Sequence, residues 1–206
     1  MSTEIEAGIA GCGYDSRICA LADSQPSSST GLEVTPEAPR DAQTVDAGGR
    51  TVAAAIDGVR HARLVLHADH RGSLAEVIDL TNPFWQQPIV YAYRFTIAPG
   101  RIKGWGMHKL QDDRYHCLAG SMRTVLYDGR VGSPTYQAFQ VCCFTAATPA
   151  LLRIPAGVWH ASHNYGDDEV IVMNFPTRPY DHAEPDKYRI DPHSGLIPFD
   201  FTLPDE

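Results

Sequence analysis

The sequence lacks the features that would assign it to the membrane-spanning or the disulfide-rich secreted proteins. None of its apolar runs approaches the ~20 residues that cross a bilayer, and its first residues contain no early Lys or Arg followed by a long apolar core. The 206 residues include five cysteines, an odd number, and no CxxC pair. We therefore expect free thiols in a reducing cytoplasm and no secretory signal.

Positive charge is also scarce, with 17 Lys and Arg against 25 Asp and Glu, so the formal net charge is -8. An acidic protein repels nucleic-acid phosphates and anionic lipid headgroups. We expect neither nucleic acid nor a membrane surface as a partner. A small anionic ligand is still compatible with this charge, because a local basic pocket can oppose the overall field.

The N-terminal part of the chain has little that could form a core. Residues 22–49 are rich in Ser, Pro, Gly and acidic residues and contain no aromatic residue. Such a segment cannot bury enough apolar surface to offset the entropy lost on ordering. We expect residues 1–50 to form a flexible tail and residues 51–206 to form one folded domain, with a short helix at Thr51–Gly58.

From residue 60 onward the sequence indicates one strand after another. Turn residues such as Gly, Pro and Asn separate short apolar windows, and no window keeps a helical period. We predict strands at Ala62–Ala68, Ala75–Leu80, Ile89–Ile97, Met122–Tyr127, Ala138–Phe144, Leu151–Pro155 and Val170–Phe175. This spacing predicts an all-β sandwich or barrel, with the residues after Thr177 wrapped around it as loops.

The strongest local motif is Ile154–Asn164, which reads P-x-G-x-x-H-x-x-x-N from its proline. Pro155 and Gly157 favour a tight turn, and alternate residues of the strand that follows point to one side. His160 would therefore face the same side as Asn164. The motif resembles the second motif of cupins, which implies a double-stranded β-helix or jelly-roll barrel.

The first cupin motif ordinarily supplies a His-x-His pair and a Glu as metal ligands. The matching region here, Gly104–Arg114, contains His108, but Leu110 stands at the second His and no Glu follows. A metal site needs three or four ligands in fixed geometry. We expect His108 and His160 to face a metal-free pocket with no cofactor, and a metal site completed by a third His is the alternative.

Three segments resemble the dTDP-4-dehydrorhamnose 3,5-epimerase family in order and spacing. They are Asp69–Glu76 for D-x-R-G-x-x-x-E, Val125–Thr135 for V-D-x-R-x-x-S-P-T, and Ile154–His160 for I-P-x-G-x-x-H. The resemblance covers about residues 62–175. It implies a homodimeric epimerase or isomerase that acts on a dTDP-4-keto-6-deoxyhexose in deoxysugar or polysaccharide biosynthesis.

The resemblance also implies roles for single residues. His108 would be the base that takes a proton next to the ketone, and His160 would line the same pocket. A neutral imidazole with a pKa near ~6.5 suits this task. Arg71 would bind the diphosphate and Glu76 would contact the nucleotide base. The other candidate substrate contacts are Arg114 and Asn164.

The sequence departs from the family pattern at three places. The Arg that usually precedes the base is missing, Val172 lies in the region where the family has its acid Tyr, and no recognisable match exists for the Asp that orients the base. Tyr180 or Asp191 could supply the acid or the orienting group. The alternatives are therefore a non-catalytic sugar-binding cupin and a metal-dependent cupin enzyme.

The composition of the N-terminal segment generates a first prediction. A variant that lacks residues 1–50 should keep the thermal midpoint of the full chain, because the removed segment buries almost no apolar surface. Differential scanning calorimetry of the two proteins checks this. A truncated protein without a cooperative transition would show that the segment packs on the domain.

Overall fold

The computed structural model describes residues 43–47, 52 and 55–202. Most of the tail expected at 1–50 lies outside the described residues, so its flexibility stays a prediction. None of the helices in the described ranges is long and apolar enough to cross a membrane.

The expected helix at Thr51–Gly58 is wrong over its described C-terminal part. Asp57 and Gly58 form a turn. Ile56 is buried in the core, and its backbone amide donates to the side-chain oxygen of Gln140, 2.8 Å away. A tertiary contact therefore fixes this segment in place of a local helix. The described ranges contain one short helix, the 3-10 turn η1 at Pro83–Trp85.

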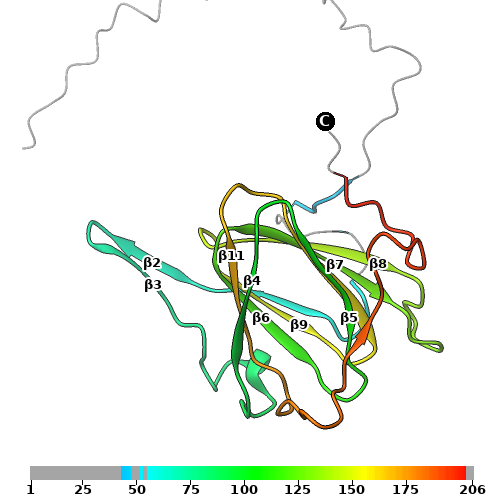
Figure 1. Cartoon of the computed structure of the whole chain (residues 1–206). Helices are drawn as coiled ribbons and strands as arrows, with labels where there is room; N and C mark the ends of the chain where they lie inside the picture. Colours follow the sequence, from blue (N-terminus) through cyan, green and yellow to red (C-terminus); the bar gives the residue numbers. More distant parts are fainter. Residues whose placement is uncertain (1–42, 48–51, 53–54, 203–206) are drawn as a thin grey trace, which may run out of the picture. The chain divides into compact units, whose positions relative to one another are not determined.

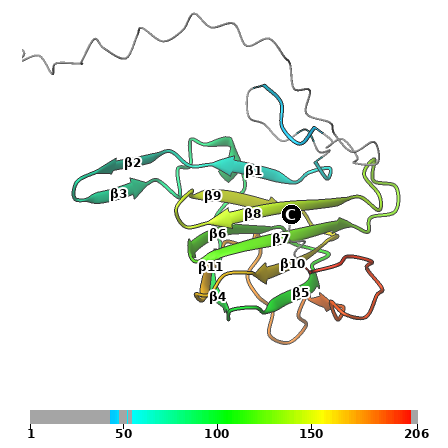
Figure 2. The same ribbon diagram turned by 90° about the horizontal axis from the view of Figure 1, so that it is seen from above.

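Two antiparallel sheets build the domain, and both are visible in Figures 1 and 2. The first sheet has the strand order β1 (Arg60–Arg63), β9 (Ala150–Ile154), β6 (Asp113–Ala119), β11 (Val170–Asn174) and β4 (Tyr93–Ile97). The second has the order β12 (Tyr188–Arg189), β5 (Ile102–Met107), β10 (Val158–Asn164), β7 (Ser121–Asp128) and β8 (Phe139–Thr145). A separate hairpin, β2 (Leu66–Asp69) and β3 (Gly72–Ala75), projects away from both sheets.

The main apolar core takes side chains from both sheets. Its fully buried members alternate along the strands, as Leu152 and Ile154 do on β9 and Val170 and Val172 do on β11. Met122 and Leu126 on β7, which are completely buried, supply the opposite layer. This arrangement confirms the predicted all-β jelly-roll barrel of the cupin type.

The C-terminal segment covers the outer face of the second sheet. Ile197 and Phe201 pack with Trp105 of β5, Val125 of β7 and Ala161 of β10 in a second buried cluster. The segment contains β12 as its only strand in the described ranges. The predicted irregular wrap is therefore confirmed, and it is held by apolar contact with the sheet.

The strand that sequence reading missed most clearly is β6. It carries buried Asp113, Arg114 and His116 between its apolar residues, so the apolar alternation typical of a strand is interrupted. The strand β5 was missed because it contains two glycines, Gly104 and Gly106. Both strands border the pocket described below.

A buried carboxylate closes the loop after β7. Asp128 accepts hydrogen bonds from Arg130 Nε at 2.8 Å, Ser133 Oγ at 2.6 Å and Thr135 Oγ1 at 2.7 Å. These bonds hold its pKa well below the usual range, although burial acts in the opposite direction. Thr135 and Arg130 in turn bind the backbone of Asp57. The D-x-R-x-x-S-P-T segment thus ties the loop after β7 to the backbone of Asp57, and we call these hydrogen-bonded residues the clasp.

This clasp allows a matched stability test, because the chain contains a second D-x-R pair on the exposed hairpin. Asp128→Ala should lower the free energy of unfolding by about 3 kcal/mol, since it leaves several buried donors and Arg130 without their acceptor. Asp69→Ala, which removes the solvent-exposed partner of Arg71, should cause no measurable change. Urea unfolding of both variants checks this, and equal losses would contradict it.

Candidate active site

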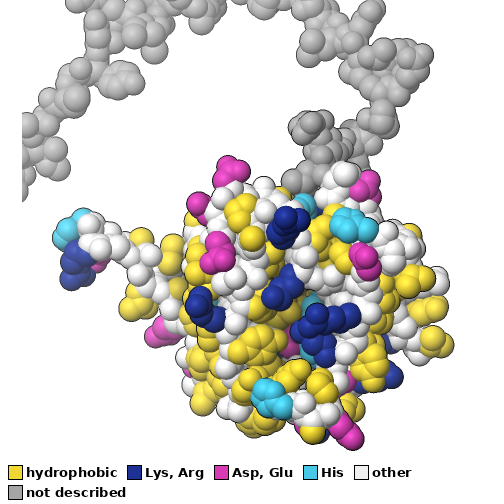
Figure 3. All heavy atoms as spheres, viewed as in Figure 1, with side chains coloured by type: hydrophobic (Ala, Val, Ile, Leu, Met, Phe, Trp, Pro, Cys, Tyr) yellow, Lys and Arg dark blue, Asp and Glu magenta, His cyan; other side chains and the backbone are white. Residues whose placement is uncertain are grey.

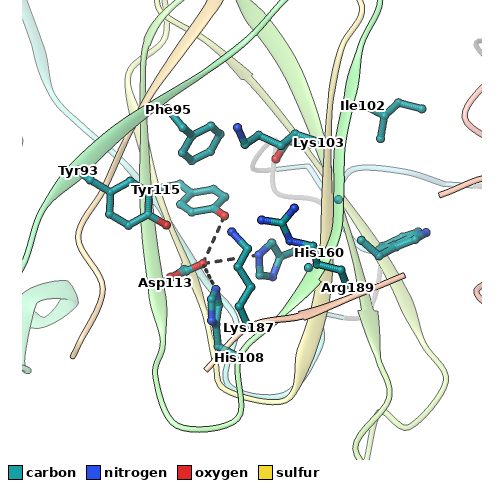
Figure 4. Close-up of a pocket in the computed structure, with 14 residues that line it drawn as sticks. Tyr93, Phe95, Ile102, Lys103, His108, Asp113, Tyr115, His160, Lys187 and Arg189 are labelled. Carbon is teal, nitrogen blue, oxygen red and sulfur yellow. Dashed lines mark hydrogen bonds and ion pairs between the residues drawn. The ribbon is translucent and has the colours of Figure 1, made fainter. Parts of the chain in front are cut away.

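A cavity of about 440 Å³ opens between the two sheets. β4 and β6 contribute to one wall, β5 and β10 to the other, and the segment at β12 borders the mouth (Figure 4). Its lining is mixed, with aromatic side chains beside ionisable ones. The labelled residues are Tyr93, Phe95, Ile102, Lys103, His108, Asp113, Tyr115, His160, Lys187 and Arg189.

Two imidazoles and one carboxylate converge in this cavity. Asp113 Oδ2 lies 3.5 Å from His108 Nε2 and 3.6 Å from His160 Nε2. The two rings are nearly parallel, with centroids 5.9 Å apart. All three residues are buried, so their mutual charge interactions are weakly screened.

Backbone carbonyls fix the tautomers of both histidines. His108 Nδ1 bonds to the carbonyl of Asp186, and His160 Nδ1 lies 3.3 Å from the carbonyl of Val158. A carbonyl only accepts, so each Nδ1 carries the proton and each neutral ring presents the lone pair of Nε2 to the cavity. Both rings can therefore accept a proton at the atom that faces the ligand space.

Neighbouring side chains hold Asp113 in place. Its Oδ1 accepts from Asn174 Nδ2 at 2.9 Å and from Gln111 Nε2 at 3.3 Å, and its Oδ2 accepts from the Tyr115 hydroxyl at 3.3 Å. The carboxylate thus cannot turn away from the imidazoles without breaking these bonds. It is placed to stabilise an imidazolium that forms on either side.

The surroundings set the protonation of the site. Burial lowers the pKa of His160, the nearby His108 lowers it further, and Asp113 opposes both. Burial and Asp113 raise the pKa of Tyr115 well above its ordinary value and that of Tyr93 to about 12. At neutral pH the site therefore offers a neutral His160 and two protonated tyrosines.

Glycine on β5 makes room for His160. A Cβ added to Gly106 would lie 3.3 Å from His160 Nε2, and one added to Gly104 would lie 2.5 Å from the Cα of Ala161. A side chain at either position would push β10 away or displace the imidazole. The strands β5 and β10 can approach closely because neither glycine has a side chain.

Three cations lie around the cavity. Lys187 and Arg189 come from the β12 segment, and Lys103 comes from β5. Figure 3 shows Lys and Arg side chains gathered on the face seen between β4 and β5 in Figure 1, although the whole chain is acidic. The local charge at the mouth therefore favours an anionic ligand.

The structure brings two of the predicted site residues, His108 and His160, to this cavity. Arg71 and Glu76 lie on or just after the projecting hairpin and are exposed, with Arg71 paired to Asp69 at 2.6 Å. Arg114 is buried elsewhere and donates to the backbone carbonyls of Phe175, Gln87 and Pro88. None of these three lines the cavity.

The other predicted residues have local partners. Asn164 donates to the carbonyls of Ile97 and Asp168, both at 2.8 Å, and thereby fixes the turn after β10. Asp191 accepts from the amide of His193 in an exposed turn. Tyr180 lies against His182 in a neighbouring groove that also reaches His108 and Lys187. Val172 is in the core.

Sequence reading missed Asp113, Asp186 and Lys187. Asp113 stands five residues after His108, within the first motif, but its inward direction depends on the strand register of β6. Asp186 holds the loop after β5 by accepting from the amides of Lys109 at 2.9 Å and Leu110 at 2.7 Å. Acidic and basic residues recur throughout 181–191 without a recognisable motif, so the sequence did not single out Asp186 or Lys187.

The His108, Asp113 and His160 set is also the one group of His, Cys, Asp and Glu in the described ranges that could hold a metal ion. Two imidazoles and a carboxylate with open positions suit a divalent transition metal. The Nδ1 contacts to carbonyls resemble those around metal-bound histidines. Lys187 and Arg189 at the mouth already carry positive charge, which disfavours the binding of a metal cation in this cavity.

Comparisons with known proteins find relatives in polysaccharide and glycan biosynthesis. The chain is 33% identical to the spore coat polysaccharide biosynthesis protein SpsL of Bacillus subtilis over 71% of this chain and 97% of that protein. It is 30% identical to the probable low-salt glycan biosynthesis epimerase Agl13 of Haloferax volcanii, over 62% and 82%.

Among solved structures, a dTDP sugar isomerase from Desulfovibrio desulfuricans G20 superposes with a TM-score of 0.65 and 27% identity, over 70% of this chain and 91% of that one. No family model matches the chain.

The contact between Asp113 and the histidines generates the prediction for this site. Asp113→Asn should lower the pKa of His160, because it removes the negative charge that favours the imidazolium. NMR titration of the imidazole resonances measures this. Asp191→Asn, the control, should leave these resonances unchanged, and a shift in that variant would make Asp191 the orienting carboxylate instead.

Proposed function

Since this chain belongs to the dTDP-4-dehydrorhamnose 3,5-epimerase family of sugar epimerases and isomerases, we propose that it acts on a dTDP-4-keto-6-deoxyhexose by moving a proton next to the ketone. The observation that carries the proposal is the pair of imidazole Nε2 atoms that lie 3.5 and 3.6 Å from the buried carboxylate of Asp113. A general base must present an unprotonated atom to the substrate carbon, and both imidazoles do so.

His108 is the proposed base. Its Nε2 takes the proton from the carbon adjacent to the ketone, and the electron pair of that C–H bond forms a C=C bond while the ketone oxygen becomes an enolate. The imidazolium formed is stabilised by Asp113. Protonation of the opposite face of that carbon by solvent inverts it, and the imidazolium then releases its proton to solvent. Return of the proton to the former carbonyl carbon, with transfer of the neighbouring hydroxyl proton to its oxygen, moves the ketone.

His160 is the proposed second proton carrier. Its ring lies beside that of His108 and shares Asp113 with it, so a proton gained by one ring lowers the basicity of the other. The pair therefore holds one proton more readily than two. This favours a cycle in which one proton is accepted and then returned.

The cationic mouth supports an anionic nucleotide portion of the substrate. Tyr91, Arg178 and Tyr180 line the neighbouring groove, which shares Arg189 and other residues with the main cavity. Such a surface offers aromatic faces for a base and charged donors for a diphosphate.

We propose a homodimer because the β2–β3 hairpin projects into solvent with exposed apolar side chains. A two-stranded hairpin is marginal by itself in water, and this one leaves Leu66 and Leu74 exposed together with Val65 before it. A second copy would cover these side chains. Arg71 and Glu76, the proposed nucleotide contacts, would then meet the substrate at the boundary between copies.

A reducing cytoplasm is the proposed location. Cys117, Cys142 and Cys143, the three cysteines in the described ranges, are free thiols. We expect the sugar-nucleotide substrate to be present in the same compartment.

A metal-dependent enzyme is the second candidate, and the set formed by His108, Asp113 and His160 favours it. In that case Nε2 of both rings would bind the ion and could not accept a proton. The metal-free reaction is the one we propose, because Lys187 already places a positive charge near Asp113 and His160.

Replacement of the base tests the proposed function. In deuterated buffer with dTDP-4-keto-6-deoxyglucose, His108→Asn should slow deuterium incorporation next to the ketone by at least about 100-fold while dTDP binding persists. His193→Asn, an exposed histidine outside the cavity, is the control.

Three results would contradict the proposal. Wild-type protein that binds the sugar nucleotide without exchange would be a sugar-binding cupin. Exchange lost on chelation and restored by a divalent metal would favour the metal-dependent enzyme. Unchanged exchange in His108→Asn would place the base elsewhere.

A further inference from the structure

The proposed reaction needs a donor at the ketone oxygen. Loss of the carbon-bound proton places a negative charge on that oxygen, and a preorganised donor there is among the largest contributions to catalysis. Val172, in the region where the family has its acid Tyr, is buried in the core and offers no donor. The described part of the chain must supply one from another element.

The two tyrosines of the cavity are weak candidates for delivering a proton. The Tyr115 hydroxyl already donates to Asp113, and the Tyr93 hydroxyl accepts from Asn174 Nδ2 at 2.9 Å. Burial raises the pKa of Tyr93 to about 12, so it gives up its proton reluctantly. Tyr93 can still donate a hydrogen bond and is therefore the competing residue.

Of the three cations, Lys187 is the one directed at the reacting groups. Figure 4 shows its ammonium reaching toward Asp113 and His160, and its charge interacts with both. The Lys103 ammonium lies over the ring of Phe95, 5.3 Å from its centroid. Arg189 can bind an anion, but a guanidinium does not release a proton in proteins.

The backbone on both sides of Lys187 is anchored. Before it, Asp186 binds His108 and the two amides that follow. After it, Tyr188 pairs with Met107 of β5, so the alternation of the strand turns Tyr188 away while Lys187 and Arg189 share the cavity side. The lysine side chain is solvent-accessible at the mouth, but its attachment point is fixed beside the base.

We infer that Lys187 is the electrophile of the proposed reaction, with its ammonium donating to the ketone oxygen and stabilising the enolate. The inference rests on the proposed function. As His108 takes the proton from carbon, the Lys187 N–H hydrogen bond to oxygen shortens, and full transfer gives an enol and a neutral amine. Collapse of the enol returns that proton to Lys187, so no other reactant is consumed.

The charges around Lys187 suit both donation of a proton to the ketone oxygen and stabilisation of the enolate. Partial burial lowers its pKa, Arg189 and Lys103 lower it further, and Asp113 opposes them. A lysine with a lowered pKa is a better proton donor at neutral pH than an ordinary one. Asp113 keeps it charged enough to attract a developing enolate.

The experiment separates binding from catalysis in the full-length protein. Deuterium exchange into dTDP-4-keto-6-deoxyglucose and the Kd for dTDP are measured for wild type, Lys187→Met, Lys187→Arg and Tyr93→Phe. The control is Lys109→Met, since the Lys109 ammonium lies over the exposed Tyr188 ring, 4.3 Å from its centroid. Thermal midpoints show that each variant is folded.

We expect Lys187→Met to lower the exchange rate by about 100-fold or more, the loss typical of one removed oxyanion donor, with Kd for dTDP changed less than about threefold. Lys187→Arg should recover part of the rate, because the charge returns without a transferable proton. Lys109→Met should match wild type, and Tyr93→Phe should lose less than Lys187→Met.

Other outcomes would overturn the inference. A Lys187→Met protein that loses dTDP affinity at an unchanged exchange rate would make Lys187 a diphosphate ligand. A larger loss in Tyr93→Phe would make Tyr93 the donor. If the wild type exchanges and Lys187→Met does so equally fast, the proposed function stands and this inference fails; if the wild type does not exchange, the proposed function has failed first.

Discussion

The site depends on one buried carboxylate held between two imidazoles. Asp113 is nearly inaccessible to solvent, and it accepts hydrogen bonds from Asn174, Gln111 and Tyr115. A buried charge costs several kcal/mol unless it is paired or hydrogen-bonded. The strands β4, β6, β10 and β11 must keep their register for these partners to meet. The chemistry and the fold are therefore coupled at this residue.

The C-terminal segment gives the cavity its charge. The chain as a whole is acidic, but pairing of β12 with β5 carries Lys187 and Arg189 to the mouth. The same pairing places Asp186 against His108 and thereby fixes its tautomer. The cationic side chains at the mouth and the contact that fixes the His108 tautomer thus come from one short stretch of backbone.

Identical short motifs play different roles in this chain. In the Asp128 and Arg130 pair the carboxylate is buried, and the pair holds the loop after β7 to the segment around Asp57. The Asp69 and Arg71 pair has the same spacing but lies exposed on the projecting hairpin. Burial decides the difference, since a charged pair in solvent contributes little while a buried one cannot be broken without loss of stability.

The sequence by itself determined the all-β class and the turn at Pro155–Gly157, because period-two alternation and turn residues are local signals. Its resemblance to the two cupin motifs identified the two pocket histidines. It did not reveal β6, whose buried polar residues hide its alternation, or the role of Arg114, which depends on carbonyls distant in the sequence. Only the tertiary structure decided that Asp113 and Lys187, 74 positions apart in the sequence, face one cavity. Whether two residues so distant in the sequence face one cavity depends on sheet order and register, which are set by packing across the whole barrel.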